Sequence, residues 1–120
     1  MIFIENGDEN DLKVFFDAHN GRLQIDFDLF KQILYDWKVY VIKKDYPIAV
    51  VIEKDGAAHI AACPNQKVGI STIRKAAKML NVTKSTVENE YKKGHALSRR
   101  LGFNVEKVEN GVTFYSAGYV

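Results

Sequence analysis

Apolar residues recur at two spacings along the first third of the chain, and each spacing predicts a different kind of element. The opening residues 1–5, MIFIE, have the composition of a short strand. Asp8 can then cap a helix with one apolar face, because apolar side chains at i, i+3, i+4 and i+7 lie on the same side of a helix. That face carries Leu12, Phe15, Phe16 and His19. Asn20-Gly21-Arg22 is expected to end this helix.

A second helix and three strands follow. Phe27, Phe30, Leu34 and Trp37 again have helical spacing, with Asp26 or Asp28 near the start. Residues 38–47, KVYVIKKDYP, then change to the β-branched and aromatic residues typical of strands. Residues 48–56, IAVVIEKDG, end in an Asp-Gly hairpin signal, and residues 57–63, AAHIAAC, form a third strand that stops at Pro64.

The second half repeats both kinds of pattern. Residues 69–80, GISTIRKAAKML, have an apolar helical face, and residues 92–102 predict another helix that ends at Gly102. Residues 83–89 between them, TKSTVEN, are ambiguous between strand and helix and favour a strand weakly. The chain closes with two strands around Asn110-Gly111, a second hairpin signal. This mixed order predicts an α+β or α/β fold in which helices cover a sheet.

Length and charge narrow the class of protein. A chain of 120 residues that is 47% hydrophobic can form one domain with a real core. Its net charge of +2 is too small to mark the whole protein as a nucleic-acid binder, so nucleic acid is not expected as a partner. Acidic residues nevertheless prevail in the first third and basic residues between Lys67 and Arg100. The basic part should attract phosphate groups.

Cysteine content and hydropathy point to a cytoplasmic protein. The single cysteine, Cys63, excludes an internal disulfide and a metal site built from several cysteines. The amino terminus turns acidic after its first apolar residues, unlike a signal peptide. The apolar run IAVVI is far shorter than the roughly 18 residues that a membrane span needs. No membrane partner is therefore expected.

Residues 63–87 contain a candidate anion site. Gly69 allows a tight turn and the close approach of a ligand, and Ser71 then begins a helix whose first amide groups are unsatisfied. Such a helix start favours anions. Lys67 and Arg74 would add positive charge at its rim.

The same residues carry a family resemblance. Gln66, Gly69 and Ser71 resemble the Gln/Arg-x-x-Gly-x-Gly/Ala motif that GNAT acyl-CoA-dependent N-acyltransferases have between their fourth strand and the next helix. Leu101-Gly102-Phe103 is similar to the Leu-Gly-Phe with which a later helix of that family ends. The order of elements also matches, so the resemblance covers the whole chain as a single domain. The stretch from Lys92 to Phe103 is particularly similar to small phage-encoded members.

The resemblance implies an N-acetyltransferase that uses acetyl-CoA. The donor would lie where the fourth and fifth strands splay apart, and an amine would attack the thioester directly in a ternary complex. Backbone N–H groups from Lys67 to Ser71, including Val68 and Ile70, would hold the pyrophosphate. The backbone of Ala61, Ala62 and Cys63 would pair with the pantetheine arm. The resemblance leaves the amine acceptor open, and it allows a homodimer.

Three departures from the family pattern concern catalysis. The tyrosine that often protonates the departing thiolate corresponds to Ser98, whose hydroxyl is a weaker general acid. Tyr91 occupies the position of an asparagine at the start of the same helix, where it would still contact the cofactor. Ser71 replaces the last small residue of the loop motif. Weakened or lost catalysis is therefore an open alternative.

Candidates for the base are few. His59 has the chemistry for proton transfer near neutral pH. Glu53 could act in the same way if its face of the strand lines the site. Cys63 is better interpreted as a small apolar residue than as a nucleophile.

Two further hypotheses remain. Residues 73–90 fit a helix-turn-helix in which Lys84, Ser85 and Thr86 begin a DNA-recognition helix, although Glu90 stands where that helix should bury an apolar side chain. The chain could also be a GNAT-like structural or interaction protein without activity, a hypothesis that rests mainly on Ser98.

Overall fold

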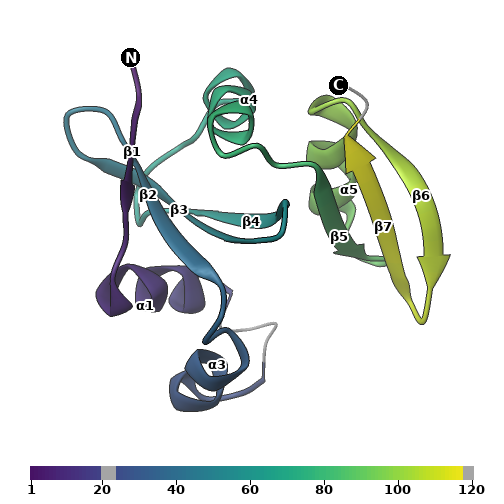
Figure 1. Ribbon diagram of the computed structural model, residues 1–120, viewed down its shortest axis with the longest axis horizontal. Coiled ribbons are helices and arrows are strands. Elements are labelled where there is room, and N and C mark those ends of the chain that lie inside the picture. The colour runs from purple at the N-terminus through teal and green to yellow at the C-terminus, as the bar shows by residue number, and fades with distance from the viewer. Residues whose placement is uncertain (20–23, 118–120) are drawn as a thin grey trace. The chain divides into compact units, whose positions relative to one another are not determined.

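The structure is a computed structural model that describes residues 1–19 and 24–117. In chain order its elements are β1 (Phe3–Asn6), α1 (Glu9–Ala18), α3 (Phe27–Ile33), β2 (Lys38–Lys43), β3 (Pro47–Lys54), β4 (Ala57–Ala62), α4 (Ile70–Met79), β5 (Lys84–Glu88), α5 (Lys92–Arg100), β6 (Phe103–Glu109) and β7 (Val112–Ala117) (Figure 1). The strands are neighbours in a seven-stranded sheet in the order β1-β2-β3-β4-β5-β7-β6. The predicted α+β order is confirmed.

The sheet is mostly antiparallel. Registered antiparallel pairs join β1 to β2, β2 to β3, β5 to β7 and β6 to β7, whereas β4 and β5 run parallel with Ala57 opposite Lys84. The chain divides into two compact units. The first unit consists of Met1–Lys54 and His59–Val68, and the second of Asp55–Ala58 and Gly69–Val120.

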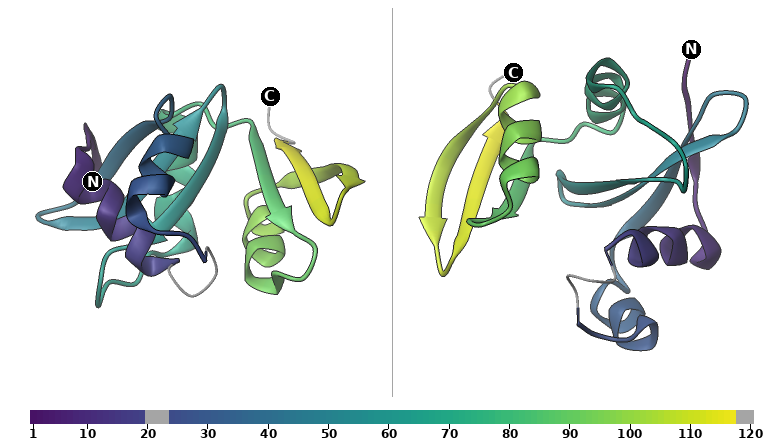
Figure 2. Two further views of the ribbon diagram at one scale, coloured as in Figure 1. Left: turned by 90° about the horizontal axis from the view of Figure 1, so that it is seen from below. Right: turned by 180° about the vertical axis from the view of Figure 1, so that it is seen from behind.

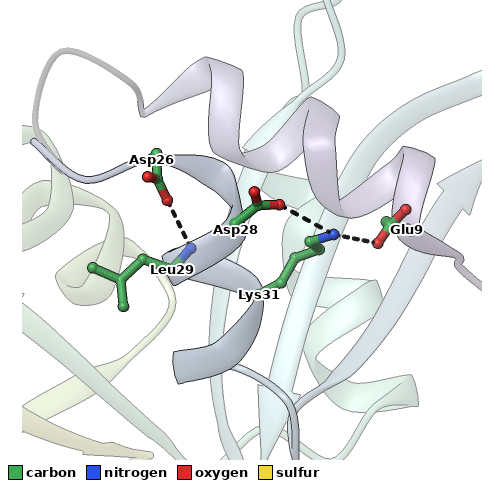
Figure 3. A network of polar contacts seen from close by, with 5 residues as sticks. All are labelled: Glu9, Asp26, Asp28, Leu29 and Lys31. Carbon is green, nitrogen blue, oxygen red and sulfur yellow. Dashed lines mark hydrogen bonds and ion pairs between the residues drawn. The ribbon is translucent and has the colours of Figure 1, made fainter.

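Aspartates begin both helices of the first unit. The Asp8 side chain accepts a hydrogen bond from the backbone N–H of Asp11, and the Asp11 side chain accepts one from Asp8, so α1 starts with a complete capping box. Asp26 caps α3 by accepting from the Leu29 N–H at 2.8 Å (Figure 3). The predicted cap at Asp8 is confirmed, and of the two aspartates expected near the start of the second helix Asp26 is the one that caps it.

Lys31 joins the two helices. Its Nζ lies 2.7 Å from a Glu9 oxygen on α1 and 3.6 Å from a carboxylate oxygen of Asp28 on α3 (Figure 3). The hydrogen bond that Lys31 donates to the Glu9 carboxylate raises the pKa of Lys31 above its ordinary value. Because these groups are exposed, the pair orients the helices more than it stabilises them.

The core of the first unit is aromatic on the helix side and aliphatic on the sheet side. Phe16 and Phe30 lie with ring centroids 5.1 Å apart. Helix α1 packs on β2 and β3 (Figure 2). Val50 and Ile52 of β3 are buried in the same cluster. The predicted apolar face of α1 is therefore the buried one. The second helix is shorter than predicted, because it ends at Ile33 and a turn from Leu34 to Trp37 leads into β2.

Two-residue turns form both predicted hairpins. Asp55 and Gly56 have φ values of 51° and 88°, and Asn110 and Gly111 have 51° and 77°. Positive φ at both central residues matches the twist of the flanking strands. The predicted end of the first helix at residues 20–22 and the last residues of the closing strand, 118–120, lie outside the described residues.

In the second unit, α5 covers one face of β5, β7 and β6 (Figures 1 and 2). The buried cluster beneath it contains Ala77, Val82, Val87, Phe103 and Tyr115. Strand β6 contains an irregularity between Val105 and Lys107, where its register with β7 shifts. This shift places one extra residue in β6, as in a β-bulge.

The helix-turn-helix hypothesis is wrong. Residues Lys84–Glu88, where its recognition helix would begin, form β5 and pair with β7 from Lys84 opposite Ser116 to Glu88 opposite Val112. The N–H groups of Thr83 and Lys84 also donate to the Gly56 carbonyl. Pairing along a central strand outweighs the weak local helix signal, as the β-branched residues Thr86 and Val87 allow.

Gly94 lets α5 approach β5 closely. A Cβ at this position would lie 2.7 Å from Val87 Cγ1 and 2.8 Å from Tyr91 Cδ2. We expect Gly94→Ala to lower the thermal unfolding temperature, because overpacking costs about 1–3 kcal/mol and the gain in helix propensity is about 1 kcal/mol. Differential scanning calorimetry measures the change, and a raised unfolding temperature would contradict this packing.

Candidate functional site

The predicted cofactor loop leaves β4 through a hydrogen-bonded turn in the first unit. The Gln66 N–H donates to the Cys63 carbonyl at 3.0 Å, and Asn65 has φ of 64°. Proline at the second position and a residue with positive φ at the third are typical of a type II turn, so Pro64-Asn65 fits this conformation. Gln66 and Val68 are half-buried, and Lys67 is exposed.

The backbone of β4 has one edge directed at β3 and one directed away. The Cys63 N–H donates to the Ile48 carbonyl at 2.9 Å, and the Cys63 carbonyl accepts from Gln66. Hydrogen-bonding groups alternate along a strand, so the N–H and C=O of Ala62 point away from β3. Ala61 is buried and Ala62 is exposed.

Helix α4 in the second unit begins without a side-chain cap. Its N-cap is Gly69, which makes no side-chain hydrogen bond, and its first turn holds no acidic residue. Helices α1 and α3, in contrast, are capped by aspartates. The amide groups at the start of α4 are thus left for water or a ligand.

Gly69 is not required by the fold. Its φ of −72° and ψ of 157° suit any residue, and a Cβ built there would meet no atom within 4 Å. A serine or aspartate at this position would cap the helix. Glycine is therefore a poorer choice for stability than other residues that fit.

The remaining predicted cofactor residues lie on α4 and at the start of α5. Ile70 is half-buried and Ser71 exposed in the first turn of α4. The Arg74 guanidinium donates to the Arg100 carbonyl at 2.7 Å, so this side chain links α4 to the end of α5. Tyr91 is the N-cap residue of α5 and packs against the second unit's core.

The predicted catalytic residues fall in different units. His59 on β4 and Glu53 on β3 belong to the first unit, and Ser98 on α5 belongs to the second. The His59 ring lies 5.8 Å from the Trp37 ring, centroid to centroid. Glu53 is half-buried opposite Lys38. Ser98 is only 3% exposed, so its hydroxyl belongs to the packed face of α5.

Cys63 is half-buried against the core of the first unit. Burial raises the pKa of its thiol, and the nearby Asp11 carboxylate raises it further. A raised pKa leaves less thiolate at neutral pH. We expect Cys63 to react with a disulfide reagent at pH 8 more slowly than a free thiol does and to speed up when urea unfolds the chain. Equal rates in the folded and unfolded states would contradict this environment.

A polar cluster that the sequence does not predict fixes the end of β5. The Nδ1 of His95 lies 2.6 Å from the Tyr115 hydroxyl, and Nε2 lies 3.0 Å and 3.2 Å from the carbonyl oxygens of Glu88 and Asn89. Carbonyls only accept, so Nε2 carries a proton, and in a neutral ring Nδ1 accepts a hydrogen bond from the Tyr115 hydroxyl. Thr113 donates to the Asn89 side-chain oxygen at 2.7 Å.

The cluster connects residues that are up to 24 positions apart, and no local spacing marks it. Only the antiparallel pairing of β5 with β7 brings Thr113 and Tyr115 to the same place as Asn89 and His95. In the described part of the chain, no helix has the length and hydrophobicity needed to cross a membrane.

Neither a protein-family model nor a curated protein sequence matches this chain. Solved structures do. The Campylobacter jejuni N-acetyltransferase PseH in complex with acetyl coenzyme A is 18% identical with a TM-score of 0.65, and the match covers 100% of each chain. A Bacillus subtilis acetyltransferase in complex with CoA is 16% identical with a TM-score of 0.60, also over 100% of each chain.

The ribosomal-protein-S18-alanine N-acetyltransferase from Escherichia coli matches with a TM-score of 0.60 and 15% identity. That match covers 98% of this chain and 93% of the other. At such identities the likeness concerns the fold. It extends over the whole length of this chain.

Proposed function

Since this chain has the fold of the GNAT N-acyltransferases, we propose that it transfers an acetyl group from acetyl-CoA to an amine. The observation that carries the proposal is the uncapped start of α4 at Gly69. There the fold leaves open space above a glycine that stability does not require. A pyrophosphate is an anion of the kind that such a helix start binds.

In this proposal the acyl donor is bound through backbone groups. The N–H groups of Gly69, Ile70 and Ser71 donate to the pyrophosphate, with Gln66, Lys67 and Val68 just before them in the chain. Arg74 adds positive charge on the next turn of α4. The pantetheine amides pair with the backbone of β4 at Ala62, whose hydrogen-bonding groups point away from β3. Tyr91 at the start of α5 packs against the cofactor.

The reaction we propose is a direct displacement. A protonated acceptor amine loses one proton to His59, or to Glu53, and the neutral amine attacks the thioester carbonyl carbon. The C–S bond then breaks, and the thiolate leaves with the electron pair. Ser98 is the proposed donor of the proton that the thiolate takes up, and the nitrogen gives its surplus proton back to Ser98 as the amide forms. Its burial supports a hydroxyl held in one place, on the same face of α5 as His95.

Calorimetric titration with acetyl-CoA tests binding, and release of free CoA in the presence of amines tests transfer. The amines should include a polyamine, a lysine peptide and a peptide with a free amino terminus. Saturable binding with CoA release for at least one amine is the expected result. Binding without release for any amine would instead support a GNAT-like protein without activity, and absence of binding would overturn the site.

A further inference from the structure

The outer face of α5 is a cationic surface, and its last residue, Arg100, is linked to α4 by the hydrogen bond from Arg74 to the Arg100 carbonyl. Lys92, Lys93, Ala96, Arg99 and Arg100 are all exposed, whereas Gly94, His95 and Ser98 on the opposite face pack towards the sheet. Four of the five exposed positions on this helix are therefore cations. We call these five residues the α5 outer face.

The cations of the α5 outer face have no acidic partners within residues 1–19 and 24–117. Several lysines elsewhere are paired. Lys13, Lys31, Lys43 and Lys54 of the first unit each form an ion pair with a carboxylate. Among the described residues, four of the seven lysines of the first unit are thus paired, whereas none of the four cations of the α5 outer face is.

The placement of Lys92 and Lys93 also opposes the local rules of helix formation. They are the first two residues of α5, whose first turn holds no acidic residue and whose N-cap residue, Tyr91, does not cap the helix with its side chain. Cations at a helix start are disfavoured by the helix dipole. A local rule broken in this way is more common at functional sites than elsewhere.

The net charge of the whole chain does not reveal this surface. The first unit has ten acidic and eight basic residues, and the second has five acidic and nine basic residues, which gives net charges of −2 and +4. The net charge of +2, which gave no reason to expect nucleic acid as a partner, averages over these two parts. It does not apply to the second unit by itself.

We propose that the α5 outer face binds the phosphate backbone of nucleic acid. Its two cation pairs, Lys92 with Lys93 and Arg99 with Arg100, are seven residues apart, or about 10 Å along a helix. That distance is about three phosphate steps along one DNA strand. Ala96 is the only apolar side chain of the face, so it lacks the large apolar residues with which helices insert into membranes.

The test is binding of a fluorescently labelled 20-base-pair DNA duplex, measured by anisotropy over a range of salt concentrations. Neutralising four phosphates predicts a slope of log K against log salt of about −3.6. Lys92→Glu with Lys93→Glu should weaken binding at least tenfold at 0.1 M salt and make the slope shallower by about two. The same variant should unfold at a higher temperature, since glutamates suit a helix start. Weaker binding together with a higher unfolding temperature would therefore show that the variant has lost the binding site and kept its fold.

Lys38→Glu with Lys44→Glu is the matched control. It changes the net charge equally at two exposed lysines of the first unit and should weaken binding less than threefold. Equal weakening by both variants would overturn the proposal, because only net charge would then matter. Displacement of the duplex by saturating CoA would overturn it too, since the anion site would be that of the acyl donor. Failure to bind the duplex would also overturn the proposal, and so would binding of a polyglutamate peptide without binding of the duplex.

Discussion

Gly69→Asp is expected to abolish binding of acetyl-CoA while making the protein more stable. An aspartate fits the extended N-cap conformation, meets no neighbouring atom and can accept a hydrogen bond from the first turn of α4. Such a cap contributes about 1 kcal/mol. The same carboxylate would stand beside the proposed pyrophosphate. Two unit charges 4 Å apart repel by about 4 kcal/mol at an effective dielectric constant of 20, or roughly three orders of magnitude in affinity.

Gly69→Asn is the control for Gly69→Asp. Asparagine caps a helix about as well as aspartate but carries no charge. Both variants should therefore raise the unfolding temperature, and only the aspartate should remove calorimetric binding. Retained affinity in Gly69→Asp would show that the donor binds elsewhere. A fall in unfolding temperature for both variants would mean that the space above Gly69 is not open.

His59→Gln is expected to lower kcat for acetyl transfer by about 10²–10⁴-fold with little change in the affinity for acetyl-CoA, if His59 is the base. Glutamine keeps most of the side-chain volume beside Trp37, so the packing of β4 should survive. Steady-state kinetics together with calorimetric binding measures both quantities.

Glu53→Gln and Ser98→Ala are the companion variants. A large loss of kcat in Glu53→Gln with little effect of His59→Gln would show that Glu53 on β3, and not His59, is the base. Ser98→Ala removes one buried hydroxyl without changing the backbone. An unchanged kcat in this variant would show that water or another group protonates the thiolate.

Local sequence signals predicted the helices and strands because the residues that cap a helix or form a turn lie next to that element in the sequence. Asp8 and Asp26 each precede the helix that they cap, and Asp55-Gly56 forms a hairpin turn because both residues adopt positive φ. The strand Lys84–Glu88 was ambiguous for the opposite reason. Its conformation comes from pairing with β7, more than 20 residues later, and nothing within the segment encodes that partner.

Some parts of the candidate site could likewise be predicted from the sequence, and others could not. Gln66, Gly69 and Ser71 form a contiguous motif, so their place at the start of a helix could be read from the sequence. The cluster of His95 with Tyr115 could not, because it depends on the register of β5 with β7. The sequence also could not indicate that Arg74 donates to a carbonyl at the end of α5. That contact depends on how two helices pack.

The difference between the capped and uncapped helices has a consequence for hydrogen–deuterium exchange. In α1 the Asp11 amide is held by the Asp8 side chain, so it should exchange only when that cap opens. At the start of α4 the amides of Ile70, Ser71 and Thr72 have no cap, so in the free protein they should exchange almost as fast as in a peptide. An anion bound there would slow all three together. The occupied site would thus be visible in the exchange rates of three consecutive amides, whatever amine the protein acts on.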